Sequence, residues 1–152
     1  MIDRRVRLLA MFGDDVLDLS RTAARSAVLD AGRDGSEQSP RYRAIVSVAE
    51  LVRFPDLVLA LTGIERLLSD DGHLWLIEPV HHPGSRATLL ASMWAMHPSI
   101  TGIHLERDVA LAIRTVGLTI TDLERFSMPT TVYPLRLFIQ GRARRVVEQV
   151  AA

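Results

Sequence analysis

The stretch that decides the fold is residues 42–80, YRAIVSVAELVRFPDLVLALTGIERLLSDDGHLWLIEPV. Its segment 44–48 is a continuous apolar run, which is typical of a parallel strand covered on both faces. Residues 73–80 form a second run of this kind, and residues 57–68 between them carry Leu, Val and Ile at helical spacing. A Pro-Asp pair opens this helix, as suits the positive end of a helix dipole. The order strand, helix, strand predicts a right-handed crossover between two parallel strands.

The chain beyond this unit predicts an insertion, a helix and a closing hairpin. Residues 81–103 hold Pro and Gly breaks around a short apolar segment, TLLASMWAM. Residues 108–116 form an amphipathic helix, and a Gly ends it. The segments 118–126 and 135–140 have strand character. The eight residues between them are too few for a parallel crossover, so we expect an antiparallel pair.

The N-terminal 40 residues predict one further strand–helix unit. The apolar run 6–12 (VRLLAMF) has the length of a buried strand, and apolar residues within 16–29 fall at helical spacing. Asp14 or Asp15 would cap that helix. Residues 32–40 read as a loop rich in Gly and Ser.

The amino-acid composition excludes several classes of protein and of chemistry. The 152 residues have a formal net charge of zero, which argues against a nucleic-acid binder, and the length is that of one domain. Cys and Lys are absent, so disulfides, thiolate metal sites and Schiff-base chemistry are excluded. No apolar run reaches the roughly 18 residues of a membrane span, and we predict a cytoplasmic protein.

The ordered set of motifs resembles class I S-adenosylmethionine (SAM)-dependent methyltransferases of the small-molecule or quinone-biosynthesis type. The segments that carry the resemblance are YRAIVSVAEL (42–51), LTGIERLLSDDGHLWLIEP (61–79), GIHLERDVALAIRTVGLTITDLERF (102–126) and the closing PLRLFIQGRAR. The resemblance implies one α/β domain over 1–152, with a degenerate unit in 1–40 and a family-like half in 41–145. It implies a Rossmann-like, mainly parallel sheet of about five strands. The implied strand order is 1-4-5-7-6 in the family's naming, with an antiparallel C-terminal hairpin.

The family's glycine-rich cofactor loop is degenerate here. The nearest text is VLDLSRTAAR (16–25), in which Ser20, Thr22 and Ala24 stand where glycines would let the backbone approach SAM. In an alternative alignment, the acid that binds the ribose hydroxyls falls on Met11. Either way, one strand–helix unit precedes Tyr42, where the family has three.

The resemblance also implies site residues at the carboxyl edge of the sheet. Ser47, Val48, Ala49 and Glu50 are the cofactor-contact candidates, since they follow a central strand. The catalytic candidates are Glu78, close to His81 and His82, and His104 in the motif GIHLERD; each would assist the acceptor. Without a functional role, Ser47 would be a buried strand residue and Glu50 an exposed carboxylate at a helix start. His81 and His82 would then belong to a polar turn. The histidines 81, 82, 97 and 104 match no metal-ligand spacing, so no metal site is predicted.

Two functions remain open from the sequence. The chain is either a divergent methyltransferase that moves the methyl group of SAM to a small or apolar acceptor, or a catalytically inactive remnant that works as a dimerisation, interaction or regulatory subunit. Because the missing outer strands would leave the first strand as a bare edge, we expect a homodimer or a complex with a partner methyltransferase.

Overall fold

The protein is an α/β sheet with one described helical layer. The computed structural model describes residues 6–7, 9–11, 13–34, 41–80, 102–128 and 137–146. The five strands are β1 (Val16–Asp18), β2 (Tyr42–Val48), β3 (Leu68–Pro79), β4 (Leu118–Ser127) and β5 (Leu137–Arg145). The helices are α2 (Thr22–Asp34), α3 (Leu57–Leu67) and α5 (Val109–Thr115), with short 3-10 turns η1 (Gly13–Asp15) and η2 (Leu51–Arg53).

The sheet has the order β1-β2-β3-β5-β4. Strands β1, β2 and β3 are parallel, whereas β5 runs antiparallel to both β3 and β4. With β2 and β3 as the family's fourth and fifth strands, this is the predicted order 1-4-5-7-6. The prediction of a mainly parallel five-stranded sheet closed by an antiparallel hairpin is confirmed.

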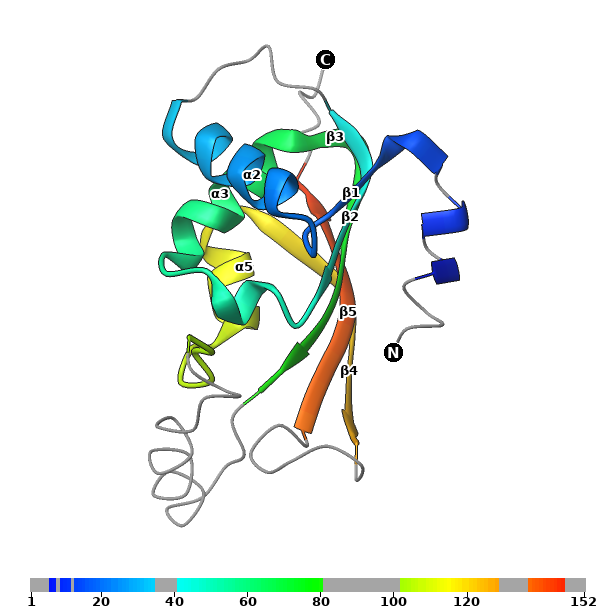
Figure 1. Ribbon diagram of the computed structural model, residues 1–152. Helices are drawn as coiled ribbons and strands as arrows, with labels where there is room; N and C mark the ends of the chain where they lie inside the picture. Colours follow the sequence, from blue (N-terminus) through cyan, green and yellow to red (C-terminus); the bar gives the residue numbers. More distant parts are fainter. Residues whose placement is uncertain are drawn as a thin grey trace, which may run out of the picture.

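Helices α2, α3 and α5 all lie on one side of the sheet (Figure 1). The contact between α2 and α3 is close, because a Cβ atom at Gly63 would overlap the backbone carbonyl of Val28. Arg66 of α3 also donates to the carbonyl oxygens of Ala31 and Gly32, at 2.7 and 2.9 Å. These contacts fix the two helices side by side over the apolar core of the sheet.

The prediction that residues 6–12 form the first strand is wrong. Residues 6–7 and 9–11 are helical, and the first strand lies ten residues later, at Val16–Asp18. The helix predicted over 16–29 therefore begins only at Thr22, and Asp14 and Asp15 belong to η1 rather than to its cap. A short apolar run does not distinguish strand from helix, and long-range pairing with β2 decided this case.

The other element predictions hold, with shifted ends. Asp56 caps α3 by accepting from the backbone N–H of Leu59 at 2.9 Å, and Gly117 follows α5 with a φ of +85°. Strand β3 begins at Leu68 instead of residue 73, because the expected turn at 69–72 is absorbed into the strand with a register irregularity against β2. Strand β5 continues to Arg145.

The predicted insertion falls mainly outside the described residues. His81, His82 and His97 lie there, as does TLLASMWAM, so the predictions for them stay open. Within the described ranges, no helix is long and apolar enough to cross a membrane.

Candidate functional site

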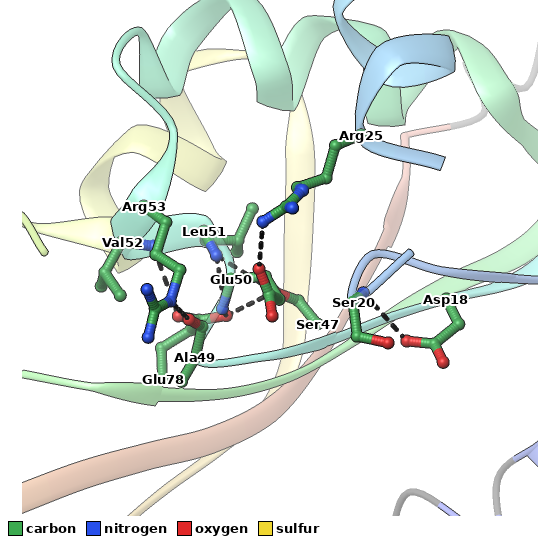
Figure 2. Close-up of polar contacts among 10 residues, drawn as sticks. All are labelled: Asp18, Ser20, Arg25, Ser47, Ala49, Glu50, Leu51, Val52, Arg53 and Glu78. Carbon is green, nitrogen blue, oxygen red and sulfur yellow. Dashed lines mark hydrogen bonds and ion pairs between the residues drawn. The ribbon is translucent and has the colours of Figure 1, made fainter. Parts of the chain in front are cut away.

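The carboxyl ends of β2 and β3 meet at a loop built around a buried carboxylate. Glu78, near the end of β3, is fully buried, and so is Ser47 near the end of β2. The hydroxyl of Ser47 donates to Oε1 of Glu78. The backbone N–H groups of Leu51 and Val52 donate to the same carboxylate, at 3.2 and 3.4 Å. Glu78 therefore fastens the start of η2 to β3 (Figure 2).

The environment of Glu78 changes its acidity. Burial raises the pKa of Glu78 from its ordinary value of 4.5 to about 7. The hydrogen bonds from Ser47 and from the backbone of Leu51, Val52 and Glu50 act in the opposite direction, since they favour the ionised form. The group titrates near neutral pH as a result.

Every backbone N–H group from residue 49 to residue 54 has an acceptor inside the protein. Ala49 donates to the carbonyl oxygen of Ile77 at 2.8 Å, and Glu50 donates to Glu78 at 3.3 Å. Residues 51 and 52 also use the carboxylate, while residues 53 and 54 donate to the carbonyl oxygens of residues 50 and 51. The loop thus has no backbone donor left for a bound cofactor.

An ion pair joins this loop to the first helix. The guanidinium of Arg25, on α2, lies 3.0 Å from Oε2 of Glu50, and the two side chains are 35% and 15% exposed. At the end of β1, Asp18 accepts from the backbone N–H of Ser20 at 3.1 Å. Figure 2 shows Arg25 reaching from α2 down to Glu50, beside the turn that holds Asp18 and Ser20.

In the part of the chain that the structure describes, the helices after β1 and β2 do not diverge to opposite faces of the sheet. In such folds a ligand binds where the connections after two neighbouring strands turn to opposite faces of the sheet. Here α2 follows β1 and α3 follows β2 on the same face (Figure 1). The two strand ends are therefore covered from the same side, and the pair Arg25–Glu50 connects them.

His104 lies on the other flank of the loop. Its backbone N–H donates to the carbonyl oxygen of Val52 at 2.7 Å, and its ring Nδ1 is 3.2 Å from a carboxylate oxygen of Glu106. Arg107 donates to the carbonyl oxygens of Phe54 and Pro55. The segment 104–107 thus holds the loop in place from the side of α5.

The structure brings together most of the residues selected from the sequence. Ser47 and Glu50 both hydrogen-bond to Glu78, and the N–H of Ala49 donates to the carbonyl oxygen of Ile77 beside it. His104 contacts the same loop through its backbone. Val48 precedes the loop and lines a cavity on the face of the sheet away from the helices. Among the described residues, no group of three or more His, Asp and Glu side chains could hold a metal ion.

Sequence reasoning missed the two arginines that secure the loop. Arg25 was noted only as part of the degenerate VLDLSRTAAR, and Arg107 only as part of GIHLERD. Their partners lie 25 and 53 residues away, on Glu50 and Phe54, so no local spacing identifies them.

The sequence matches no protein-family model and no curated protein. Solved structures do match. A SAM-dependent methyltransferase from Methanosarcina mazei aligns with a TM-score of 0.55 at 14% identity, over 74% of this chain and 64% of that chain. The [4+2]-cyclase SpnF also gives 0.55 at 14% identity, over 86% of this chain and 65% of that one. A proposed methyltransferase from Bacillus halodurans gives 0.54 at 15% identity, over 72% and 68%. This chain thus spans about two thirds of the length of these proteins.

Proposed function

We propose that this chain, which has the class I SAM-dependent methyltransferase fold, binds no SAM by itself and acts as an interaction or regulatory subunit. The observation that carries the proposal is the closed loop after β2. Its backbone N–H groups from residue 49 to residue 54 already have acceptors within the protein. A loop that grips a cofactor through its backbone needs free donors, and this loop has none to offer.

Two further features support this proposal. The turn after β1 carries Ser20 in place of a glycine, and the pair Arg25–Glu50 occupies the space between the ends of β1 and β2. The residues present therefore do not fit SAM in the family's position. The fold alone does not require methyl transfer either, since it is shared with a cyclase.

The edge of the sheet supports association with another chain. Strand β1 has three residues and pairs only with β2 among the described strands, so one of its edges is open. Open strand edges favour pairing with a second chain. We therefore propose a homodimer, with a partner methyltransferase as the alternative. Sedimentation over a wide concentration range tests this, and a mass that stays at one chain throughout contradicts the homodimer.

The second candidate function is a methyltransferase with a small or apolar acceptor. In that case Ser47, Val48, Ala49 and Glu50 contact SAM, while Glu78 and His104 lie towards the acceptor. The observation in its favour is the φ of +56° at Ala49. A non-glycine residue in the left-handed region costs about 1 kcal/mol or more, and such residues gather at functional sites.

Calorimetric titration with SAM and with S-adenosylhomocysteine separates the two functions. We expect no heat of binding and no thermal shift at millimolar ligand, because any ligand bound to the folded state would raise its melting temperature. Micromolar affinity for either compound would overturn the proposal. The variant Arg25→Ala serves as an internal check. If the ion pair alone closes the site, this variant should bind SAM more tightly than the wild type does. Because the backbone N–H groups of the loop are already hydrogen-bonded within the protein, we expect no gain in affinity for SAM.

A further inference from the structure

The face of the sheet away from the helices carries a cavity of about 310 Å³. Side chains alternate along β2, so Ile45 belongs to the core under the helices while Val46 and Val48 line the cavity. Trp75 and Ile77 of β3 line it as well. Figure 1 shows the helical residues 6–7 and 9–11 on this side, opposite the three helices, and Arg7 is the lining residue that comes from them.

The floor of the cavity suits a flat apolar molecule. It is one face of a sheet, covered here by Val46, Val48, Ile77 and the indole of Trp75. Small-molecule pockets begin at roughly 300 Å³ and are lined mainly by apolar and aromatic side chains with a few polar groups. The lining of this cavity meets the second condition, and its volume lies at the lower limit of the first.

One polar group at this cavity is held in a fixed position. The guanidinium of Arg142 lies over the ring of Trp75, with its carbon 5.0 Å from the ring centroid. Its Nε donates to the carboxylate of Asp122 at 2.7 Å. Within the described part of the chain, its two terminal nitrogens have no acceptor at hydrogen-bond distance. A guanidinium fixed on one side by a carboxylate and on one face by an indole presents two parallel donors, which match a carboxylate.

The charged residues that line the cavity favour an anion. Arg7 and Arg142 line it together with a single carboxylate, that of Asp122. This leaves one positive charge in excess. We propose that the cavity binds a flat, mostly apolar molecule with one anionic group, of the aromatic carboxylate class, and that Arg142 receives the carboxylate. Ser47 and Val48 border both this cavity and the loop around Glu78. Arg142 and Trp75 belong to the cavity and have no part in the proposed function, so the inference does not depend on it.

The test uses naphthalene carboxylate as the probe and the matching carboxamide as its neutral counterpart, titrated calorimetrically into the full chain. We expect the carboxylate to bind about tenfold more tightly than the amide, as a charge-assisted pair requires. The variant Arg142→Gln should abolish this preference. The matched control is Arg144→Gln, because Arg144 lies two residues further along β5 and does not line the cavity. It should leave the preference intact.

Nuclear magnetic resonance locates the binding. The chain has two tryptophans, so its spectrum contains two indole N–H signals, and the variant Trp75→Phe identifies the one from Trp75. We expect this signal to move on titration with the carboxylate. No saturable binding, equal affinity for the acid and the amide, an equal effect of both arginine variants, or a stationary Trp75 signal would each overturn the inference. Melting temperatures of the variants verify that each one is folded.

Discussion

Replacing Glu78 by Gln should change the way stability depends on pH. The pKa of Glu78 is about 7 in the folded protein and 4.5 as its ordinary value, so the folded state holds the proton more strongly. Between these two pH values the folded protein binds more protons than the unfolded chain, and its stability therefore falls as pH rises. At about 1.4 kcal/mol per pH unit, the interval from 4.5 to about 7 amounts to about 3 kcal/mol. Above pH 7 the folded protein has lost this full amount of stability, and below pH 4.5 it has lost none of it.

The assay is urea unfolding of the wild type and of Glu78→Gln at about pH 4 and about pH 8. Gln has the shape of the protonated acid but does not titrate, so the variant should gain about 3 kcal/mol relative to the wild type between the two pH values. The other titrating groups are the same in both proteins, so their contributions to the pH dependence of stability cancel in this comparison. Glu124→Gln, an exposed carboxylate on β4, is the control and should show no such gain. The reasoning would be refuted if the difference in unfolding free energy between Glu78→Gln and the wild type changed by less than about 0.5 kcal/mol between the two pH values.

Three further changes test the framework that holds the site. Ser47→Ala removes the hydroxyl that donates to Glu78 and accepts from the N–H of Leu51, so urea unfolding should report a loss of about 1 to 3 kcal/mol; an unchanged midpoint would contradict the network. Asp56→Ala removes the cap of α3 and should cost about 1 kcal/mol in the same assay, whereas Asp56→Asn should cost clearly less. Gly63→Ala forces a methyl group against the carbonyl of Val28 and should lower the melting temperature far more than Gly117→Ala, whose Cβ meets no atom but must adopt a φ of +85°. Equal effects of the two glycine variants would show that α2 and α3 are free to separate.

The sequence by itself determined the central unit of the fold. Apolar runs at 44–48 and 73–80 with an amphipathic segment between them specify β2, α3 and β3, because local hydrogen bonding and burial on both faces leave one arrangement for such a pattern. The capping role of Asp56 is equally local, since its carboxylate and the N–H donor of Leu59 lie three residues apart. The short link after 126 likewise determined that the last two strands are antiparallel.

Tertiary structure decided the beginning of the fold and the state of the site. Whether 6–12 or 16–18 forms the first strand depends on pairing with β2, which is a long-range contact. The proximity of Ser47 and Glu78 could be expected from their places at neighbouring strand ends. That the carboxylate is fully buried, and that it satisfies the loop's own donors, could not be expected. These features arise because α2 and α3 pack on one face and close the strand ends from a single side, an arrangement set by contacts between residues that are distant in the chain.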